Sequence, residues 1–367
     1  MPVIIGVDGN DANVEKKVGV SMYTIELLRE FQRLSNNTTS FIVYLKDEPR
    51  QDLPRATTFF TYKVVPGPFL WSQIFLPVNL FTNKKVDVFF SPAHYAPRFC
   101  PVPSVVTIHD LSFIYYPDDF LKEDLVKLNG WTRYSVNNAR SVIAVSKNTK
   151  RDILRNYHLA ENKVHVIYNG ITHGSSKSAE PKNLVVNGRY LLYVGTLQPR
   201  KNIETLIESF AMLKKKIPDL KLVIAGKRGW LYEKIFESAR ENNLSSDILF
   251  TDYLKREELV WLYKKAECLV LPSFYEGFGL PILEAMTYDC PVIASYSSSL
   301  PEIGGDACIY FDPKNALELS DKINHLLIDK NLKKTLINKG RERARLYSWK
   351  KCAEQTLKLL IDSAGSA

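Results

Sequence analysis

The sequence of 367 residues lacks several patterns that would assign it to a common class of protein. No apolar run approaches the roughly 20 residues that a membrane-spanning helix needs. The first residues form a short apolar stretch, with no basic region before it and no small-residue cleavage site after it, which argues against a secretory signal peptide. These absences predict a cytoplasmic protein that at most lies against the inner face of a membrane.

Cysteine and metal-ligand patterns are equally sparse. The five cysteines lie far apart and form no Cys-x-x-Cys pair, as expected of small apolar core residues in a reducing compartment. No Asp-x-Asp pair ends a predicted strand, and no cluster of His, Asp or Glu has metal-ligand spacing. We therefore expect neither a bound metal nor a cofactor.

The net charge of +9 does not by itself indicate a nucleic-acid-binding protein. The basic residues are scattered, and no RNA-binding motif with interleaved aromatic residues is present. Phosphorylated small molecules or an anionic membrane surface explain the charge more economically. A dehydrogenase is disfavoured because no Gly-x-Gly-x-x-Gly follows either opening strand.

Alternating apolar runs and amphipathic stretches predict an α/β protein, and the length predicts two domains. Residues 172–183 are polar and nearly devoid of apolar side chains, which indicates a linker between residues 1–170 and 171–347. We expect strands near 3–7, 41–45, 62–65, 86–90, 104–108, 141–145, 164–167, 190–195, 220–226, 248–250, 268–272 and 292–295. We expect helices ending near 34 and covering 71–82, 120–138, 203–216, 315–346 and 349–363.

Residues 273–286 follow the buried strand expected to end at 272 and form the most informative segment of the chain. Two glycines flank Phe278, and Pro281 suits the first position of a helix, so the pattern predicts a strand, a tight loop and a helix. The free N–H groups near 278–281 would then favour an anion. Glu276 and Glu284 flank these amides, and a carboxylate accepts hydrogen bonds from a diol. The alternative is that both glutamates are solvated surface residues.

Other polar side chains also lie directly after predicted strands. Arg200 and Lys201 follow the strand 190–195, and two adjacent cations there favour a bound phosphate, unless both are solvated. His109 follows the strand 104–108 and either contacts a ligand, caps the loop or pairs with Asp110. Gly19 precedes a helix, where a glycine lets backbone approach a phosphate.

The segment Glu276-Gly-Phe-Gly-Leu-Pro-Ile-Leu-Glu284 resembles the Glu-x7-Glu signature of retaining glycosyltransferases of family 4. The Arg200-Lys201-Asn202 triplet, the His109-Asp110 segment and the loop at Gly19 resemble further motifs of that family in the same order, although Ser21 replaces a second glycine. The resemblance implies the GT-B fold, in which two Rossmann-like doubly wound parallel-sheet domains face each other across a cleft. It also implies that residues 348–367 cross back to the first, acceptor-side domain.

The resemblance assigns roles to these residues. Glu276 would contact the donor sugar, Glu284 the ribose, Arg200 and Lys201 the diphosphate, and His109 would lie beside the reaction centre. The remaining donor-binding positions implied are Gly19, Leu254, Gly277, Phe278, Gly279 and Leu280. The family's usual small residue and glycine are replaced by Tyr288 and Asp289.

The expected activity is metal-independent, retaining transfer of a hexose from a nucleotide-sugar donor to a saccharide or lipid-linked glycan. GDP-mannose is the preferred donor, because the segments around His109 and Trp230 resemble mannosyltransferase-like members. A UDP-sugar donor and a non-catalytic nucleotide-sugar-binding protein remain as alternatives, whereas the Arg-Lys and Glu-x7-Glu set argues against an epimerase. A front-side route is favoured over Glu276 acting as a covalent nucleophile. The acceptor, linkage and oligomeric state do not follow from the sequence.

Overall fold

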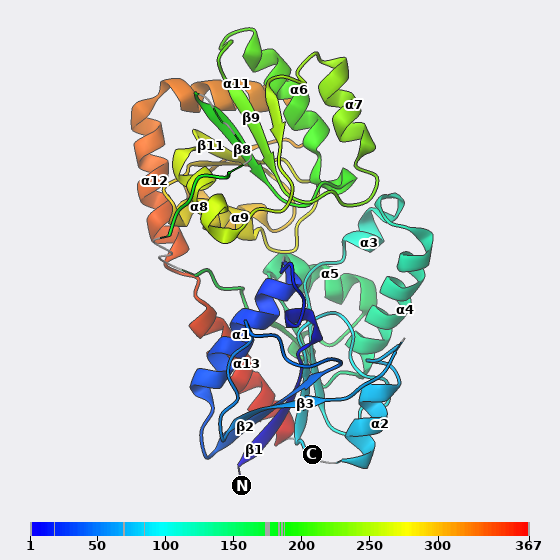
Figure 1. Ribbon diagram of the computed structural model, residues 1–367. Coiled ribbons are helices and arrows are strands. Elements are labelled where there is room, and N and C mark those ends of the chain that lie inside the picture. Colours follow the sequence, from blue (N-terminus) through cyan, green and yellow to red (C-terminus); the bar gives the residue numbers. More distant parts are fainter. Residues whose placement is uncertain are drawn as a thin grey trace. The chain divides into compact units, whose positions relative to one another are not determined.

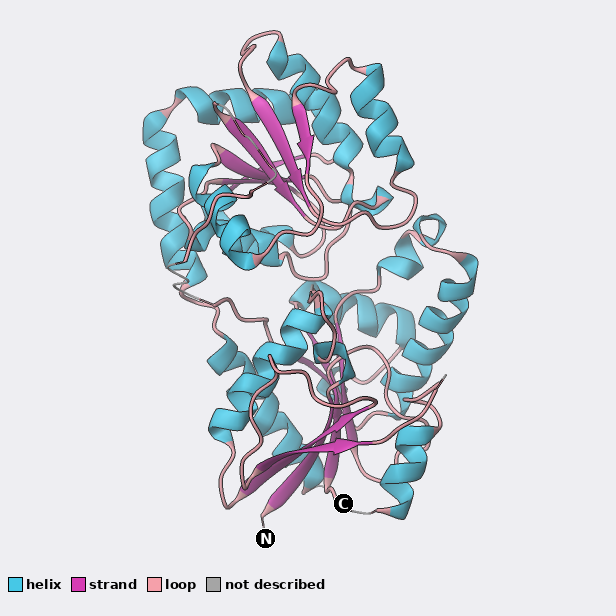
Figure 2. Cartoon of the chain, viewed as in Figure 1, coloured by secondary structure: helices cyan, strands magenta, loops and turns pink. Residues whose placement is uncertain are grey.

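The computed structural model describes residues 2–17, 19–68, 70–83, 85–172, 177–182, 184, 186 and 188–365. The chain divides into two compact units, each with a parallel sheet that has helices on both faces (Figure 1, Figure 2). The first unit comprises Met1–Tyr115, Leu121–Gly170 and Ser348–Ala367, and the second comprises Tyr116–Phe120 and Ile171–Tyr347. Part of the predicted linker, residues 173–176 and 183, lies outside the described residues.

The first unit contains a seven-stranded sheet of order β3-β2-β1-β4-β5-β6-β7. Its strands form because they are short apolar runs that can be buried on both faces, as in β5, where all five residues are buried. All seven were predicted to within two residues. Their bounds are β1 Val3–Asp8, β2 Thr39–Leu45, β3 Phe60–Val64, β4 Val88–Ser91, β5 Ser104–Ile108, β6 Ser141–Ala144 and β7 Val164–Val166.

The helices of the first unit are α1 Val20–Leu34, α2 Phe75–Thr82, α3 Ser112–Tyr115, α4 Lys122–Asn138, α5 Lys147–Tyr157 and α13 Trp349–Ala364. The final helix α13 packs against α1 and against β1, β4 and β5. The chain leaves and re-enters this unit at adjacent points, since a Cβ on Gly170 would lie 2.1 Å from the nitrogen of Trp349. Helix α2 begins later than predicted, because Leu70 has a φ of 61° and the residues after it form turns.

The second unit contains a six-stranded sheet of order β10-β9-β8-β11-β12-β13. Its strands are β8 Tyr190–Val194, β9 Lys221–Ala225, β10 Ile248–Phe250, β11 Cys268–Leu271, β12 Val292–Ser295 and β13 Cys308–Phe311. Its helices are α6 Ile203–Lys214, α7 Glu233–Glu241, α8 Arg256–Lys265, α9 Leu280–Thr287, α10 Leu300–Gly304, α11 Ala316–Ile328 and α12 Lys330–Ala344. The sequence analysis missed β13, α7, α8 and α10.

The strand order of each sheet reverses at one place, between β1 and β4 in the first unit and between β8 and β11 in the second. In open parallel sheets the connections diverge at this switch point, and ligands bind there at the carboxyl ends of the strands. Ligand-binding residues are therefore expected in the loops after β1 and β4, and in those after β8 and β11.

Candidate functional site

The loops after β8 and β11 are tied together by hydrogen bonds at the switch point of the second sheet. The N–H of Phe274 donates to the carbonyl of Arg200 at 2.9 Å. The side-chain amide of Asn202 donates to the carbonyls of Pro272 and Pro313 at 2.9 and 2.7 Å. Asn202 also has a φ of 56° and ends the 3-10 turn that contains Arg200 and Lys201. The asparagine of the triplet thus fixes the positions of the two cations.

Lys201 and Glu276 form an ion pair across these loops. The ammonium of Lys201 lies 2.6 Å from Oε1 of Glu276, and the hydroxyl of Ser273 donates to the same oxygen at 2.7 Å. Both charged side chains are largely buried, at 13% and 12% exposure. The predicted residues Lys201 and Glu276 are therefore in direct contact.

Arg200 lies in the same place. Its Nη1 donates to the carbonyl of Tyr275 over 3.5 Å, and its Nε is buried with no hydrogen-bond partner among the described residues. Buried guanidinium donors are normally satisfied, because leaving one unpaired costs free energy. The arrangement therefore leaves positive charge and an unused donor beside the Glu276 loop, which is suited to an anionic ligand.

Serine side chains at the end of β12 and just after it hold the conformation of the loop after β11. The N–H of Glu276 donates to the hydroxyl of Ser298 at 2.8 Å. Three further hydroxyls, those of Ser295, Ser297 and Ser299, donate to the carbonyls of Ser273, Phe274, Glu276 and Phe278. The sequence analysis did not single out these serines, although a polar run after a buried strand was a usable signal.

Helix α9 begins directly after this loop. Gly279 precedes it with a φ of 101°, and a Cβ there would lie 2.8 Å from a methyl carbon of Leu300. Pro281 occupies the second helical position rather than the predicted first, which it tolerates because none of the first four N–H groups has a partner within the helix. The helix start thus presents amides and a positive dipole end, as expected for an anion site.

Glu284 lies one turn further along α9 and is oriented by a residue that the sequence analysis missed. The hydroxyl of Tyr263, which is 1% exposed, donates to Oε2 of Glu284 at 2.8 Å. Burial raises the pKa of Glu284, against the opposing effects of Tyr263 and Arg256. Tyr288 stacks on Tyr263 with ring centroids 6.0 Å apart, so this departure from the family pattern supports the same carboxylate.

Asp289, the other departure, has a separate structural role. It adopts a φ of 61°, and its carboxylate forms two hydrogen bonds of 2.6 Å with Arg341 of α12. The left-handed backbone that favours glycine is therefore kept by an aspartate whose side chain joins two helices.

His109 belongs to the first unit, at the end of β5. Its Nε2 lies 2.7 Å from the carbonyl of Pro92, so that nitrogen must carry the proton. Burial, and then the neighbouring His94, lower the pKa of His109 to about 4. The side chain is thus neutral at physiological pH, and any support that it gives a charged sugar does not come from an imidazolium. Asp110, its predicted alternative partner, accepts hydrogen bonds from Ser112.

The remaining predicted positions are divided between the units. Gly19 precedes α1 in the first unit with a φ of 49°, and apart from its chain neighbours no described residue has an atom within 4 Å of where its Cβ would be. Leu254 is half-buried in the loop between β10 and α8 of the second unit. The second unit therefore brings Arg200, Lys201 and Glu276 together, with Glu284 on the adjoining helix. His109 and Gly19 lie in the other unit.

Asp8, at the carboxyl end of β1, was not recognised as a candidate from the sequence. Its Oδ1 accepts hydrogen bonds from the N–H and the side-chain amide of Asn10 at 3.1 and 3.2 Å. Burial, and then the nearby Asp11, raise the pKa of Asp8 from 3.8 to about 7. Perturbed carboxyl groups at a switch point are typical of ligand sites.

This raised pKa predicts a pH-dependent stability. Between pH 4 and 7 the unfolded chain ionises Asp8 while the folded chain keeps it protonated, so the free energy of unfolding falls by up to about 4 kcal/mol as the pH rises. Asp8→Asn should remove this fall, because asparagine keeps the acceptor oxygen and has no charge. Urea unfolding at several pH values measures the difference. Asp87→Asn at the other end of the sheet is the control, and equal pH dependence in wild type and Asp8→Asn would contradict the assignment.

Within the described part of the chain, no group of three or more His, Cys, Asp or Glu side chains is arranged to hold a metal ion. All five cysteines are free thiols, and four of them are buried. No helix of the described residues is long and apolar enough to cross a membrane.

Comparison with known proteins gives consistent matches to both units. The family model for Glycosyltransferase Family 4 matches residues 18–174, and that for Glycosyl transferases group 1 matches residues 175–343. The chain is 29% identical over 286 residues to the O-antigen chain mannosyltransferase B of Escherichia coli, covering 75% of this chain and 74% of that protein. It is 30% identical over 289 residues to an uncharacterized glycosyltransferase of Methanocaldococcus jannaschii, covering 75% of each.

Solved structures match over the whole length. Sucrose-phosphate synthase from Thermosynechococcus elongatus superposes with a TM-score of 0.79 at 20% identity, covering 100% of both chains. HepE from Anabaena, solved in complex with UDP-glucose, gives a TM-score of 0.75 at 17% identity, covering 99% of this chain and 100% of that one. At these identities the likeness concerns the fold, and the predicted α/β architecture of the GT-B type with two parallel-sheet domains is confirmed. Together with the family models, the matches establish that the chain belongs to the glycosyltransferases of family 4 and group 1.

Proposed function

We propose that the chain is a retaining hexosyltransferase that uses a nucleotide-sugar donor, GDP-mannose in first place, and a hydroxyl of a saccharide or lipid-linked glycan. The observation that supports this most strongly is the convergence of Arg200, Lys201 and Glu276 beside the start of α9. Two cations and a set of helix amides suit a diphosphate, and the carboxylate among them suits sugar hydroxyls.

We assign the following roles as part of this proposal. Arg200, Lys201 and the amides of residues 278–280 bind the diphosphate and stabilise the charge that develops on it as the sugar leaves. Glu284, held by Tyr263, accepts from the ribose hydroxyls. His109 acts as a neutral hydrogen-bonding group towards the donor sugar, and Gly19 leaves room for the donor phosphates.

In the front-side route, the bond between the anomeric carbon and the phosphate oxygen breaks while the acceptor oxygen bonds to the same face of that carbon. The acceptor proton passes to the departing diphosphate oxygen, so no protein nucleophile is required. Oε1 of Glu276 already accepts from Lys201 and Ser273, which favours a hydrogen-bonding role for this carboxylate over nucleophilic attack. The positive charge of Arg200 and Lys201 makes a divalent metal unnecessary in this scheme.

GDP-mannose is preferred as the donor because the chain resembles the O-antigen chain mannosyltransferase B. A UDP-sugar is the alternative donor, because HepE, which has the same fold, was solved with UDP-glucose bound. GDP-mannose should raise the melting temperature by several degrees when it is present well above its dissociation constant, since about 100-fold excess stabilises by about 2.7 kcal/mol. UDP-glucose and ADP-glucose should raise it less. Transfer from radiolabelled GDP-mannose should persist in EDTA.

The same experiment separates the alternatives. Selective stabilisation and turnover by a UDP-sugar would replace the donor assignment without changing the reaction class. Stabilisation by GDP-mannose without hydrolysis or transfer to any glycan would favour a non-catalytic binder. Loss of transfer in EDTA, restored by Mg²⁺, would contradict metal independence.

A further inference from the structure

Helix α2 of the first unit exposes an apolar face. Ile74, Val78 and Phe81 are 47%, 57% and 48% exposed, and their spacing of four and three residues places them along one side of the helix. The opposite side, with Leu76 and Leu80, is buried. No charged residue occurs within the helix. The helix is therefore apolar on its exposed side as well as on its buried side, which is unusual for a helix facing water.

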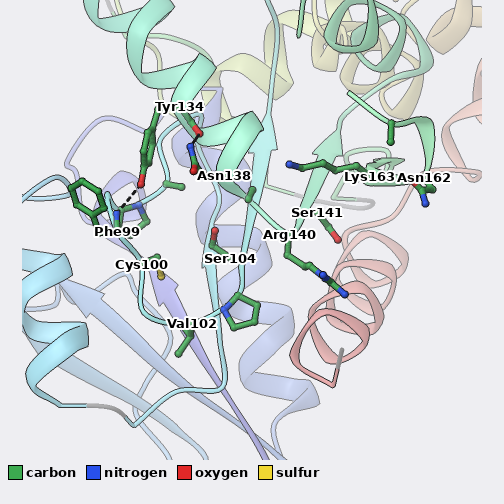
Figure 3. Close-up of a pocket in the computed structure, with 15 residues that line it drawn as sticks. Phe99, Cys100, Val102, Ser104, Tyr134, Asn138, Arg140, Ser141, Asn162 and Lys163 are labelled. Carbon is green, nitrogen blue, oxygen red and sulfur yellow. Dashed lines mark hydrogen bonds between the residues drawn. The ribbon is translucent and has the colours of Figure 1, made fainter. Parts of the chain in front are cut away.

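Phe99 adds a fourth exposed apolar side chain on a neighbouring segment. It is 73% exposed and is held at a φ of 51°, a left-handed conformation that a bulky residue rarely adopts. Its N–H donates to the hydroxyl of Tyr134 at 2.7 Å, as Figure 3 shows. The backbone therefore holds an aromatic ring outward at a conformational cost, which is typical of positions kept for an interaction.

The two segments pack on one hydrophobic cluster. Leu76 and Leu80 of α2 belong to it, and Cys100 and Val102, which follow Phe99, pack against it. The loop of Phe99 leads to the amino end of β5, where a cavity of about 870 Å³ opens (Figure 3). The apolar patch, defined as Ile74, Val78, Phe81 and Phe99, thus lies on segments that lead to the amino ends of β4 and β5, whereas His109 follows the carboxyl end of β5.

The segments that carry the apolar patch are basic. Residues 53–109 contain one acidic side chain, Asp87, whose carboxylate accepts a hydrogen bond from the N–H of Ile4. The same residues contain five cations, Arg55, Lys63, Lys84, Lys85 and Arg98, and the guanidinium of Arg98 lies over the ring of Tyr134. Arg140 and Lys163 line the cavity beside Phe99. Apolar and aromatic groups flanked by cations match the interface of a bilayer with anionic headgroups.

We propose that the apolar patch docks the first unit on an anionic lipid surface. The helix expected at 120–138 was another candidate for this role, but in α4 the first-turn residues Glu123 and Asp124 lie between Lys122 and Lys127, so the charge around its exposed Val126 is mixed. Mixed charge attracts an anionic membrane less than the basic surroundings of α2 do. The inference does not depend on the proposed reaction, since none of these residues belongs to the donor loops.

Flotation of the full chain with phosphatidylcholine vesicles, with and without phosphatidylglycerol, tests the proposal. We expect binding only with phosphatidylglycerol, and a marked loss near 1 M salt, where the Debye length falls to about 3 Å. Val78→Asp combined with Phe81→Asp should weaken binding by about tenfold or more, because two apolar side chains no longer enter the interface. Val126→Asp on α4, at 74% exposure, is the matched control and should have little effect.

Phe99→Gly separates docking from folding. Glycine relieves the left-handed strain at position 99, so the melting temperature should rise while vesicle binding falls. Binding that is unchanged in the α2 and Phe99 variants, or that Val126→Asp weakens equally, would overturn the proposal. So would a loss of self-association in the α2 variant without any vesicle binding, which would identify a second copy of the chain as the occupant.

Discussion

Glu276→Gln should lower sugar transfer by about 10²- to 10³-fold, since it removes a charged acceptor from the site where the donor sugar is expected. Oε1 of Glu276 accepts from both Lys201 and Ser273. Glutamine offers one acceptor oxygen, and its NH2 group donates hydrogen bonds and accepts none. Either the Lys201 contact or the contact to sugar hydroxyls must then be lost.

The loop itself should survive this substitution, because its shape depends on backbone groups. The N–H of Glu276 donates to Ser298, and its carbonyl accepts from Ser299. Turnover measured as product formation, together with a melting curve, distinguishes lost chemistry from lost folding. An active Glu276→Gln enzyme with unchanged donor affinity would remove Glu276 from the site.

A matched control exists at the other end of the same strand. Glu267 precedes β11 and pairs with Lys333 at 2.6 Å and with Arg189 at 2.8 Å. The ion-pair chemistry is the same, but the amino end of a parallel strand is not where ligands bind. Glu267→Gln should therefore cost stability while leaving turnover unchanged.

The sequence predicted the sheets better than it predicted the site. Strands such as β11 and β12 are fully buried apolar runs, which parallel sheets require. β13 was missed because two of its four residues are only partly buried and its run is short. Helices α7 and α8 were missed because their exposed faces are highly charged and their apolar residues few.

Within the site, residue types were predictable but contacts were not. The motif spacing singled out Glu276 and Lys201, yet these residues are 75 positions apart, and only the sheet topology brings them together. The positioning groups lie further from any motif, as with the hydroxyl of Tyr263 on Glu284, 21 positions away. The neutral state of His109 depends on burial and on His94, neither of which a linear pattern reveals.

Arg200→Ala should lower the turnover number by about 10²- to 10³-fold, with a smaller loss in donor affinity, because the diphosphate is most negative as the sugar leaves. Of the two cations, Arg200 gives the more specific test, because its removal does not break the ion pair between Lys201 and Glu276. Lys201→Ala would leave the largely buried Glu276 carboxylate without its partner, and breaking a buried pair costs about 3–5 kcal/mol of stability. A Lys201 variant would therefore lose stability as well as turnover, and the two losses could not be separated by an activity assay.

Two measurements make the Arg200 prediction specific to the diphosphate. Calorimetry should show weaker binding of GDP to Arg200→Ala, and unchanged binding of guanosine, which has no phosphate for the guanidinium to contact. Added guanidinium ion should restore part of the turnover, whereas Arg200→Lys should restore little, because a point charge does not replace a planar fork. Lys333→Ala, which removes a cation from the pair at Glu267, is the control. Equal GDP affinity in wild type and Arg200→Ala would show that the unpaired Nε of Arg200 does not face the donor phosphates.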